Sequence, residues 1–268
     1  SGKTYITTGT YFYLRTSKTV AIHVADGALA SLTNHIDTYT NDGVVLLKTG
    51  GGTFEAQHVG TDNAFAEVDV REGVLGGVNV ASWRNMKSRA YRVRNGATLA
   101  LPAQDWLSTV SVGDVNVRPD LHVEEGGIVK AGGMVRVGNL TGAGEICGYT
   151  EGAKNNSWQT ICVYPSEDAV FSGQVWTCFE VSSTSVGRFI LGRADTLAHC
   201  YRVTGSRIGF VPGLSGTIRL GESFSDNTYY RPEAGYPLHL ADTNGAPVTI
   251  STLAFFLSAY RPEMDGPG

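Results

Sequence analysis

Residues 109–146 read TVSVGDVNVRPDLHVEEGGIVKAGGMVRVGNLTGAGEI, and this stretch decides the expected fold. Its strand-like segments are only a few residues long, and corners such as Gly126-Gly127 and Gly132-Gly133 join them. Glycine readily adopts the positive φ angles that tight corners need. A β-sandwich would want longer connections between its strands. Short strands with almost no loop between them therefore predict a β-solenoid, in which each coil stacks on the previous one.

The same pattern covers most of the chain, which we expect to be all-β. Segments such as FAEVDV (65–70), YRVR (91–94) and VTISTLAFFL (248–257) read as strands, and no glycine-free window shows helical periodicity. Of the 268 residues, 34 are glycine, nearly twice the usual share of about 7%. This composition fits a protein with many tight corners.

The charge of the chain limits its possible partners. A net charge of −4 argues against nucleic acid, because nucleic-acid surfaces are normally basic. The most basic segment, RNMKSRAYRVR (84–94), could line a groove for single-stranded nucleic acid, but a solvated strand face explains it better. No apolar run approaches the roughly 18 residues that span a bilayer, so we expect no membrane insertion.

Two further stretches resemble a known repeat. LLKTGGGTFEA (46–56) followed by AEVDVREGVLGG (66–77) resembles the autotransporter-associated β-strand repeat of passenger domains, and LTGAGEI (140–146) resembles its terminal phrase. The resemblance implies a parallel β-helix from an exported bacterial protein. It therefore implies a secreted or cell-surface location. The opening SGKTYITTGT lacks the pattern of a signal peptide, so we expect a chain in its mature form. The resemblance implies no particular chemistry, because such scaffolds carry adhesins, toxins and enzymes alike.

The glycine run at 50–52 also invites a phosphate-binding interpretation, which the residue order opposes. A phosphate-binding loop needs its lysine after the glycines and a helix behind them. Here Lys48-Thr49 precedes the glycines, and TFEAQHV (53–59) alternates like a strand. We expect a corner between two strands.

The chain is expected to change character near residue 147. Residues 1–146 carry the repeat-like sequence and are predicted to form the solenoid. Residues 147–268 are predicted to form a second β-rich domain, either a continuation of the solenoid or a β-sandwich. All four cysteines lie there, and they favour two disulfides in an exported protein, with buried thiols as the alternative. They are Cys147, Cys162, Cys178 and Cys200.

Carboxylates are the catalytic candidates. Ala-Asp-Thr occurs at Asp195 and again at Asp242, and it resembles half of the aspartic-protease phrase, whose two aspartates share a proton. The glycine that completes the phrase is missing from both copies. Neighbouring acids could also act as acid/base pairs on a polysaccharide-cleaving solenoid, although a solvent-exposed strand face would carry the same charged residues. These pairs are Glu67 with Asp69, Glu124 with Glu125, and Glu167 with Asp168.

The candidate binding residues are aromatic. Tyr229, Tyr230, Arg231 and Tyr236 form an exposed-looking group suited to sugars or protein surfaces. The N-terminal aromatics, from Tyr5 to Tyr13, are instead expected to cap the open end of the solenoid. The scattered histidines and cysteines show no metal-ligand spacing, so neither a metal nor a cofactor is expected.

The sequence therefore predicts an exported bacterial β-protein for adhesion to, or recognition of, host or environmental glycans or proteins. The alternative is a secreted carboxylate-dependent hydrolase, an aspartic-type protease or a glycosidase, acting on mucin-like glycoproteins. The sequence leaves open whether the chain is an enzyme.

Overall fold

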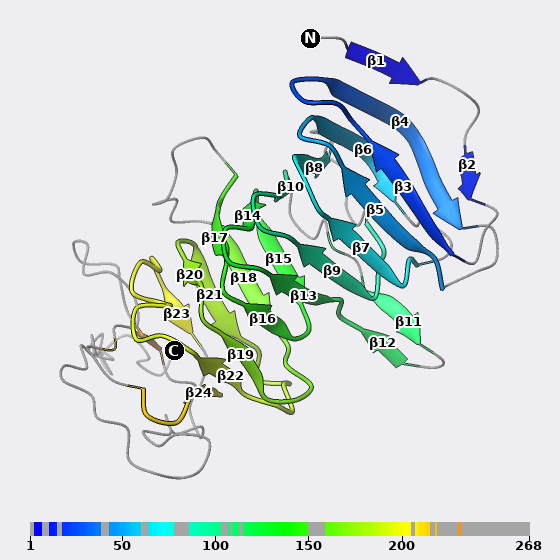
Figure 1. Cartoon of the computed structure of the whole chain (residues 1–268). Helices are drawn as coiled ribbons and strands as arrows, with labels where there is room; N and C mark the ends of the chain where they lie inside the picture. The colour runs from blue at the N-terminus through cyan, green and yellow to red at the C-terminus, as the bar shows by residue number, and fades with distance from the viewer. Residues whose placement is uncertain are drawn as a thin grey trace, which may run out of the picture.

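The computed structural model describes residues 3–6, 11–14, 18–38, 43–59, 64–77, 86–102, 107, 109–112, 115–149, 159–204, 207–214, 218 and 230–231. Within these residues the chain is all-β, as predicted, and contains no helix. Its parallel strands stack coil on coil along one axis, in the manner of a β-solenoid (Figure 1). With no helix in this part of the chain, no helical segment there could cross a membrane.

Three sheets run along the stack. Sheet A contains β1 (Lys3–Ile6), β2 (Tyr11–Leu14), β4 (Leu29–Thr38), β6 (Thr53–Val59), β8 (Val74–Gly77), β10 (Thr98–Leu101), β14 (Ile128–Ala131), β17 (Glu145–Gly148) and β20 (Gln174–Val175). Sheet B contains β3 (Thr19–His23), β5 (Val45–Thr49), β7 (Glu67–Val70), β9 (Ala90–Val93), β13 (Asp120–Val123), β16 (Leu140–Gly142), β19 (Ala169–Phe171), β22 (Phe189–Leu191) and β24 (Ile208–Phe210). Sheet C contains β15 (Met134–Val137), β18 (Thr160–Val163), β21 (Cys178–Val181), β23 (Val203–Thr204) and β25 (Tyr230–Arg231).

Strand register carries the chain from one coil to the next. In sheet B, Val68 pairs with Tyr91, which lies 23 residues later. Tyr91 pairs with Leu121, 30 residues later. This longer coil includes an inserted antiparallel hairpin of β11 (Val110–Val112) and β12 (Val115–Val117). Leu121 then pairs with Leu140, only 19 residues later. Coil length therefore varies while the stacking register is kept.

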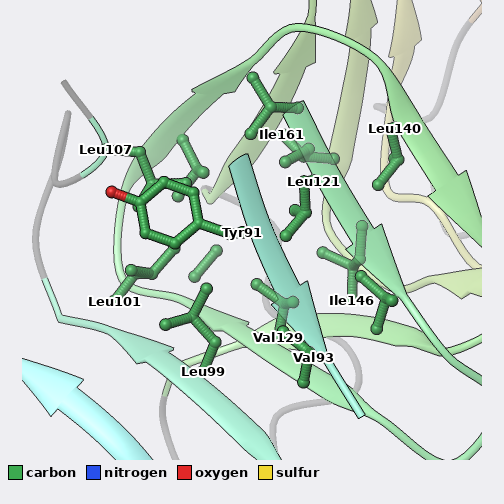
Figure 2. Packing of buried hydrophobic residues seen from close by; sticks show 14 of the residues in the cluster. Tyr91, Val93, Leu99, Leu101, Leu107, Leu121, Val129, Leu140, Ile146 and Ile161 are labelled. Atoms are coloured by element: carbon green, nitrogen blue, oxygen red, sulfur yellow. The ribbon is translucent and has the colours of Figure 1, made fainter. Parts of the chain in front are cut away.

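The core is a column of apolar side chains enclosed by the sheets. Alternate residues of each strand face inward. Parallel pairing in register therefore places the inward residues of successive coils one above another, in rows. Val68, Tyr91, Leu121 and Leu140 form one such row, and all four are fully buried. Figure 2 shows the Tyr91 ring among aliphatic side chains from sheets A and B. The Tyr91 hydroxyl has no hydrogen-bond partner among the described residues, and burial raises the pKa of this phenol.

Glycines with positive φ form the corners between sheets B and A, as the sequence predicted. Gly50 has a φ of 75° and Gly73 a φ of 63°. A side chain at Gly50 would collide with the carbonyl oxygen of Val24 in the preceding coil. Gly96 has a similar φ of 73° but faces open space. The corner at Gly50 thus needs glycine for both its φ and its close packing, whereas the corner at Gly96 needs it for φ alone.

Lys48 lies inside this corner, in the stretch that had invited the phosphate-loop interpretation. It occupies an inward position of β5, beside Val70 of the next coil, and is only 1% exposed. Its Nζ donates to the carbonyl oxygens of Thr49, Gly50 and Glu72 at 3.0, 2.6 and 3.0 Å. Burial lowers the pKa of this lysine, and the nearby Glu72 and Asp26 partly offset that effect. Lys48 therefore holds a corner together.

The side of the solenoid opposite this corner changes along the chain. In the early coils, Ile36 of β4 pairs there with Val59 at the end of β6, and isolated parallel bridges then link Val59 to Met86 and Met86 to Leu107. From β15 onward the same side is closed by sheet C. Sheet A continues past residue 146, because Ile146 pairs with Val129 on one side and Val175 on the other. Sheet B continues as well, because Gly142 of β16 pairs with Phe171 of β19. The strands after residue 147, as far as β24, thus extend the parallel stacking of those before it.

The prediction of two disulfides is wrong, because all four cysteines are thiols. Cys162 lies opposite Glu180, and Cys178 lies opposite Thr160. The two cysteines are therefore offset by two residues along adjacent strands. Such diagonal neighbours have Cα atoms about 8 Å apart, beyond the roughly 7 Å limit for a disulfide. Burial, with help from Glu180, raises the pKa of Cys162 to about 12, so this thiol stays protonated.

Candidate functional site

The predicted acid pair Glu67 and Asp69 lies on the outer face of sheet B, among arginines. Asp69 is 2% exposed and accepts hydrogen bonds from Arg71 Nε at 2.9 Å and Arg94 Nε at 2.8 Å. Glu67 Oε1 lies 3.3 Å from Arg92 Nε. Burial alone would raise the pKa of Asp69, but the hydrogen bonds from Arg94 and Arg71 outweigh it and hold that pKa below its usual value. A carboxylate held ionised in this way is poorly suited to donate a proton.

The other predicted acid pairs have similar surroundings. Glu124 accepts from Arg94 Nη1 at 2.7 Å, and its pKa is lowered because this bond and one from the Asn95 backbone outweigh its desolvation. Asp168 has a lowered pKa, chiefly because of its hydrogen bonds to Arg188. Their sequence neighbours, Glu125 and Glu167, are exposed. These arrangements support ion pairing on a solvated surface more than acid/base catalysis.

Pairing with acids also accounts for Arg92 and Arg94, two of the basic residues of the stretch 84–94. Arg92 and Arg94 face outward from β9 and its end, where Glu67, Asp69 and Glu124 neutralise them. The mixed charges give no continuous basic groove for a phosphate backbone at this strand. No group of three or more His, Cys, Asp or Glu side chains suited to a metal ion occurs in the described part of the chain.

Asp195, the first predicted catalytic residue, lies in a turn-rich segment that follows β22. This segment runs beside β20, because the Val175 N–H donates to the Thr196 carbonyl at 3.0 Å. Its inward residues Leu197 and Cys200 are fully buried. Asp195 itself is partly exposed and accepts from Gln174 Nε2 at 3.1 Å and Arg193 Nη2 at 2.8 Å.

A second contact joins the same two elements. The rings of Trp176, just after β20, and His199, from the turn segment, are stacked with centroids 3.9 Å apart and an interplanar angle of 8°. His199 points to the outside while its neighbour Cys200 faces the core, where its Sγ contacts the Val175 carbonyl at 3.3 Å. The two residues therefore face opposite ways, as adjacent residues on a strand would be expected to.

These contacts create two rows of side chains across the outer face of sheet A. Glu145 pairs in register with Gln174, which in turn contacts Asp195. In the second row Cys147 lies beside Trp176, because the Trp176 N–H donates to the Ile146 carbonyl. We call this surface the Trp176 patch. It consists of Glu145, Cys147, Gln174, Trp176, Asp195 and His199.

The patch combines planar rings with hydrogen-bonding groups. An indole stacked on an imidazole gives a flat, largely apolar element, in which the indole Nε1 is buried. Beside it, a carboxamide and two carboxylates can donate to and accept from hydroxyl groups. All six residues are half-buried, so packing restricts their rotamers. This combination suits recognition of polyhydroxylated molecules.

Sequence reasoning found only one member of this patch. Asp242, Tyr229 and Tyr236 lie outside the described residues. Tyr230 and Arg231 form β25, at the edge of sheet C, where Tyr230 pairs with Val203 and Arg231 with Thr204. The alternation of Gln174, Val175 and Trp176 was a usable signal, since it places the two polar-edged side chains on one face.

Comparison of the chain with protein-family models, with curated proteins and with solved structures found no match to any of them. The likeness to the autotransporter-associated repeat consequently rests on the sequence motifs alone.

Proposed function

We propose that the chain is a recognition protein that binds glycans, free or on glycoproteins, through the Trp176 patch. The observation that carries the proposal is the ring stack of Trp176 and His199 beside the Gln174–Asp195 hydrogen bond. Aromatic rings contact the apolar faces of sugar rings, and the amide and carboxylate groups contact their hydroxyls. Two secondary contacts from one turn segment hold these groups in place before a ligand arrives, which lowers the entropic cost of binding.

The scaffold supports the same role. A stack of short parallel strands displays side chains in regular rows on a rigid surface, which suits extended ligands such as oligosaccharides. We further propose that the chain acts outside the bacterial cell, secreted or at the surface, as its repeat-like sequence indicates. The thiol state of the cysteines supplies no argument for this location, and three of the four are buried in any case.

We also propose that the chain has two functional parts, with a boundary earlier than the predicted residue 147. The early coils, with sheets A and B, serve as a spacer. The later coils, with sheet C added, carry the patch at β17, β20 and the turn segment. The functional part would thus begin near residue 134 and use both the solenoid and its last described coils.

Glycan-array screening followed by calorimetry on the best glycan tests the proposal. We expect saturable binding that weakens at least about tenfold in Trp176→Ala, and also weakens in Asp195→Asn and Gln174→Ala. Val170→Ser is a matched surface control, because Val170 is 43% exposed on sheet B. Absence of binding to every glycan, or equal binding by Trp176→Ala, would contradict the proposal.

The same preparation separates recognition from hydrolysis. Incubation with mucin-type glycoprotein and with denatured protein from pH 3 to pH 8 is expected to leave both intact. Cleavage that disappears in Asp195→Asn or Asp242→Asn would instead establish the carboxylate-dependent hydrolase.

A further inference from the structure

The outer face of sheet C is buried, although it points away from the core. On the inner face, Ile161 of β18 pairs with Phe179 of β21, and both are fully buried. Because strand residues alternate between the two faces, Thr160, Cys162 and Cys178 point outward. They are nevertheless only 4%, 1% and 3% exposed. Sheet C is therefore covered on both of its faces.

The outer face of sheet B provides a comparison. Ala90 of β9 and Thr141 of β16 occupy outward positions there, and both are half-buried. Their side chains are about as small as those of Thr160 and Cys162, so side-chain size does not explain why the residues on sheet C are buried. An additional layer of polypeptide over the outer face of sheet C accounts for the difference.

Arg202 indicates a second property of this layer. Val203 pairs with Phe179, so Arg202 lies beside Cys178 on the outer face of sheet C. The Arg202 Nε is buried and has no hydrogen-bond partner among the described residues. Buried donors in folded proteins are almost always paired. The layer should therefore supply oxygen acceptors near Arg202, as well as apolar side chains over the small residues.

We propose that residues 232–268, which lie outside the described residues, form this layer, with VTISTLAFFL (248–257) over β18 and β21. The segment follows Arg231 of β25, the last described strand of sheet C, so it begins at the edge of the face that it covers. Three strand spacings, or roughly 14 Å, separate β25 from β18. An extended chain spans this distance in about five residues, so residues 232–247 are long enough to reach β18. This role goes beyond the proposed glycan binding, whose patch lies on sheet A.

The composition of residues 232–268 has both properties. Bulky apolar residues stand at adjacent positions, Phe255 and Phe256, so either side of an extended chain can place a ring over the small residues of sheet C. The segment also carries four acids and one arginine. On the outer face of sheet C, Arg136 lies beside Cys162 and Arg202 beside Cys178. An acidic segment complements these two arginines.

Two other segments outside the described residues adjoin strands of sheet C, and neither has the same composition. Residues 150–158 (TEGAKNNSW) precede β18, and residues 219–229 (RLGESFSDNTY) precede β25. Both are mostly polar, and each contains a single large apolar ring without a hydroxyl, Trp158 or Phe224. They are the alternative occupants of the outer face, and the experiment below includes both.

Labelling of the folded full chain with a thiol reagent, read by mass spectrometry, tests the proposal. Cys147 alone should react in the wild-type chain. Phe255→Asp combined with Phe256→Asp should lift the layer and add the two thiols of sheet C. Cys200 should stay unreacted, because its Sγ faces the core.

Trp158→Asp and Phe224→Asp are the matched controls, and neither should expose the thiols of sheet C. Their exposure in either control, but not in the double variant, would assign the cover to another segment and overturn the proposal. Unchanged labelling in all variants would overturn it as well, because the side chains of sheet C would then cover themselves.

Disulfide trapping decides the case in which the double variant unfolds and Cys200 reacts too. Phe255→Cys and Phe256→Cys are made singly, and the folded chain is oxidised. One of them should form a disulfide with a thiol of sheet C, identified in the digested chain by mass spectrometry. Phe224→Cys is the matched control and should form none. Absence of such a disulfide from both positions, or its formation by Phe224→Cys instead, would overturn the proposal.

Discussion

The early and late coils of this solenoid fill their interiors differently. The early coils, enclosed by sheets A and B and joined on the third side between Val59, Met86 and Leu107 by isolated bridges, are filled mainly by valine and leucine and admit Lys48 at a corner. The late coils, closed by sheet C, are filled by phenylalanines from sheets B and C. Phe179 and Phe189 have ring centroids 4.5 Å apart, and Phe171 and Phe189 6.3 Å. Phenylalanine rings thus contact one another across sheets B and C in the late coils, where a third sheet closes the interior.

The largest expected effect comes from emptying the late core. Phe189→Ala should lower the free energy of unfolding by about 3–5 kcal/mol, and Val93→Ala in the early core by about 2–3 kcal/mol. Guanidinium melts measure both. Because sheets A and B are continuous, we expect both variants to shift one common transition. Separate transitions for the two variants would mean that the early and late coils fold as independent domains.

The next effect concerns the buried carboxylate of the early coils. Asp69→Asn should cost about 1–3 kcal/mol at pH 7, because Arg71 and Arg94 lose a charged acceptor. The folded-state pKa of Asp69 lies below its ordinary value of 3.8. The wild-type chain should therefore keep this stabilisation above pH 3.8 and lose it as the pH falls below 3.8 through the lowered folded-state pKa, and the variant should not. An identical loss of stability with falling pH in the wild-type chain and in Asp69→Asn would contradict this role of Asp69.

Corner glycines allow a comparison within the early coils themselves. Gly50→Ala and Gly96→Ala both force alanine into a positive φ, which costs about 1 kcal/mol. Only Gly50→Ala also drives a methyl group into the neighbouring coil. The Gly50 variant should therefore be the less stable of the two in thermal melts. Equal melting temperatures of the two variants would show that the backbone of the preceding coil shifts at little energetic cost to accommodate the added methyl group.

The smallest effect is chemical. Cys147 is half-buried while Cys162, Cys178 and Cys200 are buried, so a thiol reagent should modify Cys147 first and the other three only after unfolding. Mass spectrometry of the native chain should find no disulfide. A native disulfide between any two of them would contradict the thiol assignment.

Local features of the fold could be predicted from sequence, and contacts across coils could not. The corners at Gly50, Gly73 and Gly96 were predictable because a positive φ is a property of one residue. The inward position of Lys48 was not, since a lysine in a strand normally faces water, and only the converging carbonyls of two coils make its burial tolerable. The thiol state depends on a two-residue offset between β18 and β21, which the spacing of cysteines does not reveal.

The candidate site shows the same limit. Asp195 was found through a repeated tripeptide, but its hydrogen-bond partner Gln174 lies about twenty residues earlier and meets it only through coil register. His199 is one of the scattered histidines, whose spacing in the sequence gives no sign of a site. Its stacking on Trp176 follows from a turn segment that takes the place of the next strand in sheet A.

The most direct test of the account is the indole N–H signal of Trp176 in an NMR titration with the best-binding glycan, assigned by its loss in Trp176→Phe. The account predicts that this signal shifts progressively and saturates at the calorimetric affinity. Saturable glycan binding that leaves this signal unchanged would contradict the placement of the binding site at the Trp176 patch.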